Sequence, residues 1–169
     1  MLLRNISSIY ILNNDEILLM KKRSSKLFLG ELWCAVGGHF ENIELNDPKA
    51  CIIRELLEET SLNASDINDL TLKYITIRKK DNEIRQQYIY FANLFNKTAK
   101  LSECDEGELH WVKINEMEKL KMSYTNTQCL EHYFLTGIND NLIYAGTVMV
   151  EKNNPKMVFT PLQDFDTSY

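Results

Sequence analysis

Three glutamates stand close together in the segment RELLEET, residues 54–60, at positions 55, 58 and 59. If the segment is helical, the spacing i, i+3, i+4 places Glu55, Glu58 and Glu59 on one face, within a few ångströms of one another. Like charges at this spacing cost roughly 0.2–0.5 kcal/mol per pair on an exposed helix, and Arg54, four residues before Glu58, offsets part of that cost. Hard cations such as Mg²⁺ take oxygen ligands of this kind, so the stripe predicts a metal site.

A solvated acidic face is the usual interpretation of an isolated ExxEE pattern, because Glu is a common helix former. The residues upstream favour a site instead. Gly37 and Gly38 follow the apolar segment LWCAV, and Glu44 lies six residues beyond Gly38. A glycine pair at the end of a strand can turn sharply and present a backbone carbonyl as a further oxygen ligand.

A helix over residues 47–60 is expected to position the glutamates. Asp47 is suited to cap this helix, and Pro48 suits its first position. Its apolar side is expected to consist of Ile52, Ile53, Leu56 and Leu57. With that side buried, the acidic stripe would face outward into a cleft.

The remaining patterns indicate a sheet with helices around it. Two hairpins are expected, with strands at 2–12 and 16–22 about a turn at 13–15, and strands at 70–80 and 84–95 about a turn at 81–83. Apolar and aromatic residues occupy both faces of the strand at 84–95, which is typical of a strand covered on two sides in a mixed sheet. Further elements are expected as a short helix at 115–120, a helix at 126–136 ending on Gly137, and a strand over LIYAGTVMV.

Length and composition indicate one α/β domain over residues 1–169, because no repeat or linker divides the chain and its tail, EKNNPKMVFTPLQDFDTSY, gives no clear pattern. The net charge of −5 argues against a general binder of nucleic acid, although a small anionic substrate is compatible with it. Neither a signal peptide nor a membrane span is indicated near the start, so a cytoplasmic protein is expected. The four cysteines lack zinc spacing and are expected to be reduced and mostly buried.

The segment GHFENIELNDPKACIIRELLEETSL, residues 38–62, resembles the signature of the Nudix hydrolases. That signature runs Gly, five residues, Glu, seven residues, then Arg-Glu-apolar-x-Glu-Glu-x-Gly-apolar. Two departures are present: nine residues separate Glu44 from Arg54, and Ser61 stands where the family has Gly. The insertion leaves the register of the three helix glutamates intact, so it puts the role of Glu44 in doubt more than theirs.

The resemblance implies an α/β/α sandwich with a mixed β-sheet, and hydrolysis of a nucleoside diphosphate linked to another group by water attack at phosphorus. It implies Mg²⁺, with Mn²⁺ as the alternative, held by Glu55, Glu58, Glu59 and the Gly38 carbonyl, and Arg54 orienting Glu58. Such metals neutralise the phosphate charge that the acidic stripe would otherwise repel, and they can activate water.

A second acidic segment, ECDEGELHWVKI at residues 103–114, precedes and enters a strand. In the Nudix hydrolases a glutamate in this loop often serves as an extra metal ligand or as the base. Glu106, five residues before Trp111, matches that position best, and Glu108 is the alternative. From the residues alone, a solvated acidic loop is an equally good interpretation.

Among Nudix branches, LLMKKRSSKLFLGELWCAVGGHFE resembles the entry strand and loop of MutT-like enzymes that remove oxidised purine triphosphates. This implies substrate-binding positions for Lys22 and Arg23 near the phosphates or base, and for Trp33 beside the base, although core packing is the commoner role of such a Trp. Asn126 could read a base edge. The oxidised-purine enzymes have an Asn where Cys34 stands, so the base is left open.

Two classes of function follow. The first is a metal-dependent pyrophosphohydrolase acting on a nucleoside triphosphate, with an oxidised purine nucleotide as one candidate, or on a related compound such as ADP-ribose, a nucleotide sugar or capped RNA. The second is a noncatalytic Nudix-fold sensor that binds a nucleotide. Retention of the acidic stripe favours the enzyme. No basic surface for long RNA is indicated, no membrane partner is expected, and both a monomer and a homodimer are open.

Overall fold

Strands dominate the structure, a computed structural model that describes residues 1–22, 31–96, 98–102 and 105–164. The strands within these residues are β1 (Leu2–Asn13), β2 (Glu16–Lys22), β3 (Leu32–Cys34), β4 (Val36–His39), β5 (Ile67–Lys80), β6 (Glu83–Leu94), β7 (Gly107–Lys113), β8 (Ile143–Glu151) and β9 (Asn154–Leu162). The α-helices are α1 (Pro48–Thr60) and α2 (Tyr124–Leu135), and the 3₁₀ helices are η1 (Asn42–Glu44), η2 (Ala64–Asp66), η3 (Ile114–Lys119) and η4 (Gly137–Asn139).

The strands form one mixed sheet with the order β3-β2-β1-β6-β5-β8-β9. β4 pairs with β1 and β7 pairs with β2, off this path. The pairs β1–β6 and β5–β8 are parallel, whereas the remaining pairs are antiparallel. A mixed sheet was the prediction, and it is confirmed.

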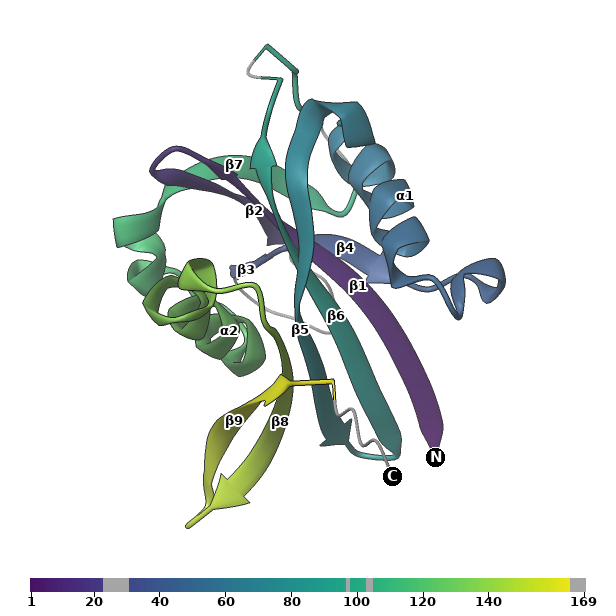
Figure 1. Cartoon of the computed structure of the whole chain (residues 1–169), viewed down its shortest axis with the longest axis vertical. Coiled ribbons are helices and arrows are strands. Elements are labelled where there is room, and N and C mark those ends of the chain that lie inside the picture. Colours follow the sequence, from purple (N-terminus) through teal and green to yellow (C-terminus); the bar gives the residue numbers. More distant parts are fainter. Residues whose placement is uncertain (23–30, 97, 103–104, 165–169) are drawn as a thin grey trace.

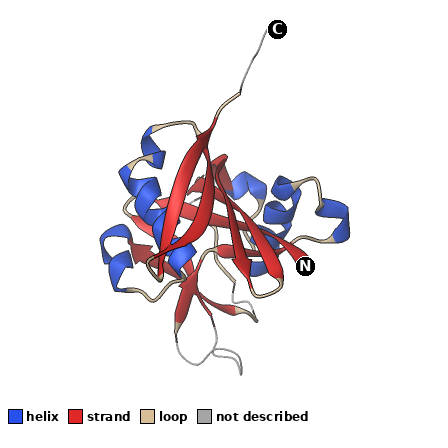
Figure 2. Ribbon diagram, turned by 90° about the horizontal axis from the view of Figure 1, so that it is seen from below, coloured by secondary structure: helices blue, strands red, loops and turns tan. Residues whose placement is uncertain are grey.

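The two α-helices cover opposite faces of the sheet (Figures 1 and 2). α1 packs on the face that presents Ile9, Ile11 and Leu18, where it contributes Ile52 and Leu56. α2 packs on the other face through a core cluster that contains Tyr10, Ile17, Leu19, Tyr74, Ile89, Phe91, Cys129, Leu130 and Tyr133. The chain therefore has the α/β/α sandwich fold that its sequence predicts.

Both expected hairpins are present, with turns that leave Asn14 and Asp81 in the left-handed region at φ 56° and 52°. Asn and Asp tolerate this conformation better than other non-glycine residues, which is why the chain turns at these points. β6 is covered on both faces as predicted, because Ile89 and Phe91 belong to one core and Tyr90 and Ala92 to the other.

The structure differs from the prediction in the C-terminal third. α2 begins at Tyr124 rather than 126, because Ser123 caps it by accepting a hydrogen bond from the Asn126 amide at 3.3 Å. The tail forms β9, which pairs with β8 about a turn at Lys152 and Asn153, both in the left-handed region. Two consecutive residues of that conformation make a hairpin turn whose twist suits antiparallel strands.

The cysteines are largely buried, as expected: Cys51 and Cys129 are buried and Cys34 is half-buried, whereas Cys104 lies outside the described residues. None of the helices in the described ranges has a stretch long and apolar enough to cross a membrane.

Candidate functional site

Helix α1 is capped at both ends and packs against the sheet along one side. The Asp47 carboxylate accepts a hydrogen bond from the Ala50 amide at 2.9 Å, and Pro48 occupies the first turn, as predicted. Ile52 and Leu56 are fully buried against the sheet. The helix ends at Ser61, whose φ is 63° and whose amide donates to the Leu57 carbonyl at 2.9 Å.

The apolar side of α1 is narrower than the sequence predicts. Leu57 was expected on the buried side, but its side chain is 50% exposed, and Ile53 is half-buried. Successive helix residues differ by about 100° in direction, so a stripe centred on Ile52 and Leu56 cannot also bury Leu57. The two flanks of this stripe are consequently available to polar side chains.

Those flanks hold the three glutamates at different depths. Glu55 and Glu59 are buried, at 8% and 4% exposure, whereas the Glu58 side chain is 56% exposed. The stripe is thus a partly buried cluster with one accessible carboxylate rather than a uniformly solvated face.

Arg54 connects the cluster. Its Nη1 donates to Glu55 Oε1 at 2.8 Å and to Glu58 Oε2 at 2.9 Å. Its Nη2 also donates to the His39 carbonyl at 3.1 Å, which ties the helix to the end of β4. One guanidinium therefore fixes the relative positions of two glutamates and of the segment that follows the glycine pair.

Glu44 is the strongest partner of Arg54, a role that the sequence left in doubt. Arg54 Nε and Nη2 donate to its two carboxylate oxygens at 2.7 and 2.9 Å, a bidentate pair. Glu44 is buried, and these bonds to Arg54 lower its pKa to about 2. The two extra residues before the helix fall between Glu44 and Pro48 and do not prevent the contact.

Glu59 faces the glycine pair. Its Oε2 accepts a hydrogen bond from the Gly37 amide at 2.7 Å, while its Oε1 is buried and has no hydrogen-bond partner in the described part of the chain. Burial is the main cause that raises the pKa of Glu59 to about 7. Gly37 has φ 141°, which favours glycine, and a Cβ on Gly38 would collide with the Glu55 carboxylate.

Glu106 approaches the cluster from the turn before β7. It forms an ion pair with Lys22 at the end of β2, and this bond is the main cause that lowers the pKa of the Glu106 carboxyl. The Glu106 and Glu59 carboxyls also interact electrostatically, so the two acidic segments predicted from the sequence lie close together. Glu108 instead points to His110, 3.4 Å away.

Within the described residues, no three His, Cys, Asp or Glu side chains converge in a ready coordination geometry. Arg54 holds Glu55 and Glu58, and the Gly37 amide holds Glu59. The donors are nevertheless all oxygens, the Glu59 Oε1 atom lacks a partner, and Glu58 is exposed enough to turn. These features fit a divalent cation that prefers oxygen ligands.

The predicted substrate-binding residues are distributed over several elements. Lys22 pairs with Glu106, whereas Arg23 lies outside the described residues. Trp33 is half-buried in β3, packs against the α2-side core and lies 5.2 Å from the His110 ring. Asn126 is buried in the first turn of α2. The structure thus groups Lys22 with the carboxylates, places Trp33 on the neighbouring strand opposite Lys21, and places Asn126 on α2.

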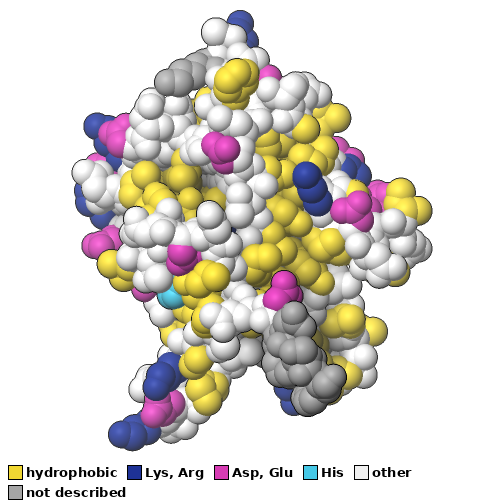
Figure 3. All heavy atoms as spheres, viewed as in Figure 1, with side chains coloured by type: hydrophobic (Ala, Val, Ile, Leu, Met, Phe, Trp, Pro, Cys, Tyr) yellow, Lys and Arg dark blue, Asp and Glu magenta, His cyan; other side chains and the backbone are white. Residues whose placement is uncertain are grey.

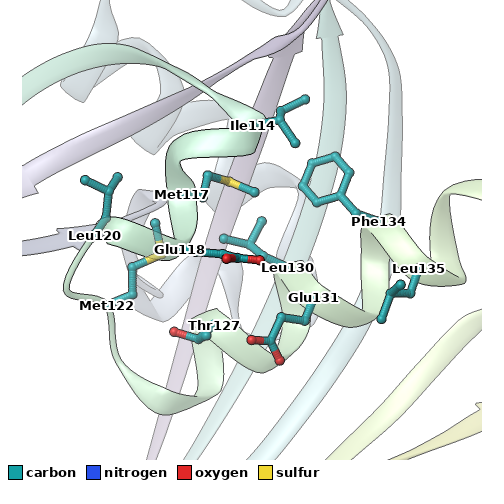
Figure 4. A pocket seen from close by; sticks show the side chains of 10 residues that line it. All are labelled: Ile114, Met117, Glu118, Leu120, Met122, Thr127, Leu130, Glu131, Phe134 and Leu135. Carbon is teal, nitrogen blue, oxygen red and sulfur yellow. The ribbon is translucent and has the colours of Figure 1, made fainter.

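Two hollows lie away from the carboxylate cluster. One, of about 510 Å³, is lined by Trp33 and His110 among others. Another, of about 320 Å³, lies between η3 and α2, where Met117, Leu130 and Phe134 point into it (Figure 4). Neither is lined by the glutamates of α1.

Comparison with known proteins agrees with this geometry. A family model described as NUDIX domain matches residues 1–133. The fold is similar to that of the MutT protein from Bacillus halodurans, with a TM-score of 0.71, 19% identity, and coverage of 92% of this chain and 97% of that one. A MutT NUDIX hydrolase from Burkholderia pseudomallei has a TM-score of 0.62 at 20% identity, covering 78% of this chain and 98% of that one. An Ap4A hydrolase from C. elegans has a TM-score of 0.64 at 16% identity, covering 80% of this chain and 98% of that one.

Proposed function

This chain belongs to the NUDIX domain family and is a Nudix hydrolase, and from that premise we propose that it cleaves a phosphoanhydride bond in a nucleoside triphosphate or a related nucleoside diphosphate. The observation that carries the proposal is the cluster of Glu55, Glu58 and Glu59 on α1. Arg54 holds the first two, and the Gly37 amide of the glycine turn holds the third. Oxidised purine nucleotides, ADP-ribose and nucleotide sugars are the candidate substrates within this class.

Glu55, Glu58, Glu59 and the Gly38 carbonyl are the groups that would hold a divalent cation, Mg²⁺ or Mn²⁺. When bound, the cation would neutralise phosphate charge and lower the pKa of a coordinated water. Glu58 has the accessible carboxylate, so it can turn from Arg54 toward a ligand. Glu59 has the unpartnered oxygen, and a cation would supply the partner that this buried atom lacks.

Arg54 acts as a positioning residue in this proposal. Glu44 holds one edge of its guanidinium by two bonds, so the remaining edge is directed at Glu55 and Glu58. A bidentate pair of this kind fixes the plane of the guanidinium. Glu44 therefore supports the arrangement without itself acting on the substrate.

Glu106 is proposed as the additional acidic group of the site, in preference to Glu108. The Glu106 carboxyl interacts with Glu59, whereas Glu108 is turned toward His110. Lys22 holds Glu106 ionised and is well placed to bind an incoming phosphate. Ionised Glu106 can accept a proton from water that attacks phosphorus, which is the chemistry of a general base.

Trp33, Arg23 and Asn126 remain candidates for binding the nucleoside. The hollow beside Trp33 and His110 supports a base-binding role for Trp33, because it leaves room next to a half-buried indole. A buried amide such as that of Asn126 can discriminate between donor and acceptor edges of a base.

A small nucleotide fits the surface better than long nucleic acid. On the face shown in Figure 3, the Lys and Arg side chains of the described residues stand in separate small groups among Asp and Glu. Binding to a nucleic acid backbone needs a continuous basic surface. We also infer that residues 1–169 form one domain, because β8 and β9 extend the sheet of the family-matched part.

The test is release of phosphate or pyrophosphate from a panel of canonical and oxidised nucleoside triphosphates, ADP-ribose and dinucleotides, with Mg²⁺ or Mn²⁺. Glu58→Gln should lower kcat by at least about 100-fold. It removes an accessible carboxylate that would hold the cation, and this cation would stabilise the negative charge of the transition state. Glu118→Gln, an exposed glutamate on η3, is the matched control and should retain activity. If the wild-type protein binds nucleotides but hydrolyses none of them, the result would contradict the proposed hydrolase and support a nucleotide sensor.

A further inference from the structure

Three arginines lie side by side on the sheet, outside the carboxylate cluster. In the register of the sheet, Arg4 of β1 lies opposite Arg85 of β6, and Arg85 lies opposite Arg78 of β5. Residues opposite one another in a sheet project from the same face, and neighbouring strands are about 4.8 Å apart. The guanidinium groups therefore form a row across three strands, named here the arginine row.

Within the described residues, the row carries more positive charge than its ion-pair partners balance. Glu83 is shared by two members, with Oε1 accepting from Arg4 Nε at 2.7 Å and Oε2 accepting from Arg85 Nη2 at 2.9 Å. Arg78 is half-buried, and its side chain makes no hydrogen bond or ion pair with any residue of the described ranges. Among the described residues, one carboxylate thus pairs with two of the three guanidinium groups of the row.

Like charges placed directly opposite in a sheet are destabilising. Arg78 is affected in this way, because burial and the nearby charge of Arg85 both lower its pKa. Among the described residues, no partner of the Arg78 side chain offsets this cost. An anion bound to the row would supply the missing charge.

The row is connected to the candidate site through β4. Gly37 lies opposite Ser8 and His39 lies opposite Ile6, so β4 leads along β1 toward Arg4. The Nη1 atom of Arg4 lies 3.5 Å from Nε2 of His39. From Ser8 to Arg4 is four residues, or about 13 Å along the strand. The row shares the face of Tyr10 on the α2 side of the sheet, whereas Gly38 faces Glu55 on the α1 side. A substrate that passes the end of β4 beside His39 can therefore contact both the glycine turn and the row.

We propose that Arg4, Arg85 and Arg78 form a subsite for a phosphate group of the substrate that lies outside the bond being cleaved. This inference rests on the proposed function for the identity of the substrate. Guanidinium groups bind phosphate oxygens in a bidentate manner, and a phosphate monoester carries a charge close to −2, which matches the excess of the row. The preferred substrate is then a nucleoside diphosphate derivative that bears a further phosphate.

The first measurement is calorimetric binding of inorganic pyrophosphate to the full chain in EDTA, so that hydrolysis and metal binding play no part. Arg78→Gln should weaken binding roughly tenfold, because it removes a charged hydrogen-bond donor. Lys79→Gln is the matched control: it removes the same charge from the next residue, whose side chain points to the opposite face, and should change the Kd less than twofold. Arg78→Lys should restore part of the loss.

The second measurement compares ligands that differ by one phosphate, coenzyme A against dephospho-coenzyme A and NADP against NAD, under the same conditions. The phosphate-bearing member of at least one pair should bind about tenfold tighter, and Arg78→Gln should remove that difference. An equal loss of binding affinity in Arg78→Gln and Lys79→Gln would overturn the proposed subsite. The proposal would also be overturned if Arg78→Gln weakened pyrophosphate binding while the two members of each ligand pair bound with equal affinity. That result would show a site for free anions only. If the expected binding differences are observed but the wild-type protein hydrolyses none of the substrates, the proposed function is refuted and the subsite is not.

Discussion

The contact between Glu44 and Arg54 shows how one residue pair can organise the candidate site. Arg54 has several acceptors within reach, and without Glu44 it could bind Glu55 and Glu58 in more than one orientation. The bidentate pair with Glu44 removes that freedom, because Arg54 donates its Nε and Nη2 hydrogens to Glu44 and keeps Nη1 for the helix glutamates. The position of the metal-binding candidates therefore depends on a residue that belongs to a different segment.

This pair gives a pH-dependent prediction for stability. The pKa of Glu44 is lowered from 4.5 to about 2 in the folded protein, mainly by Arg54. A lowered folded-state pKa contributes stability that is complete above pH 4.5 and is lost as the pH falls toward 2. Glu44→Gln should therefore destabilise the protein at pH 7 by about 3 kcal/mol, since it breaks a buried ion pair.

Urea unfolding between pH 7 and the lowest pH at which both proteins stay folded would check this. The difference between wild type and Glu44→Gln should shrink steadily below pH 4.5, because protonated Glu44 resembles Gln. Asp15→Asn, in the exposed turn after β1, serves as the control for removing a negative charge. A difference that stays constant with pH would refute the proposed ionised pair.

At the scale of the element, the end of α1 is unusual because Ser61 occupies a left-handed position at φ 63°. A non-glycine residue in this conformation costs roughly 1–2 kcal/mol. The Ser61 hydroxyl offsets part of the cost through a hydrogen bond with the Ser102 hydroxyl at 2.6 Å. The departure from glycine in the signature is thus accommodated by a contact with the loop before β7.

Two substitutions at this position should act in opposite directions. Ser61→Gly removes the strain and loses the exposed hydrogen bond, so we expect a net stabilisation of about 0.5 kcal/mol. Ser61→Ala keeps the strain and loses the bond, so we expect a destabilisation of about 1 kcal/mol. Thermal unfolding of both variants beside the wild type measures the two effects. Destabilisation by both would mean that the hydroxyl contact outweighs the backbone strain.

At the scale of the whole molecule, the hairpin of β8 and β9 completes the core on the α2 side. Phe159 of β9 packs against Tyr74 of β5 and His132 of α2, with ring centroids 5.3 and 4.3 Å apart. The Tyr124 hydroxyl donates to the Pro155 carbonyl at 3.0 Å and accepts from the Met157 amide at 3.2 Å. The β8–β9 hairpin is thus attached both to α2 and to the centre of the sheet.

Phe159→Ala should accordingly destabilise the whole fold by about 3 kcal/mol, at the lower end of the range for core aromatics because Phe159 is only half-buried. Urea unfolding followed by far-UV circular dichroism and by Trp fluorescence measures this. The two signals should shift together, since the hairpin shares one core with the rest. Val150→Ala, at an exposed position near the hairpin tip, is the control and should have little effect. Unfolding in two separate steps would show that the hairpin is an independent unit.

Sequence patterns alone were sufficient to predict the structural features that depend on local residue spacing. The i, i+3, i+4 spacing in RELLEET predicted the three glutamates on α1, and Asp47 with Pro48 predicted where that helix begins, because both signals act within one or two turns. The turns at Asn14 and Asp81 were predicted for the same reason. β9 was missed, since its residues are mostly exposed and its sequence lacks a clean alternation of apolar and polar residues, although Asn153 was an available turn signal.

Only the tertiary structure decided how these elements meet. Leu57 was expected to be buried and is exposed, because the sheet contacts a narrower stripe of α1 than hydrophobicity suggests. The bond that Arg54 donates to Glu44 spans a loop of altered length, and the approach of Glu106 to Glu59 joins segments more than forty residues apart. The arginine row depends on the register of three strands, and a shift of one residue would turn each arginine to the other face. Local spacing determines which residues share a face, whereas strand register and helix docking determine which faces come together.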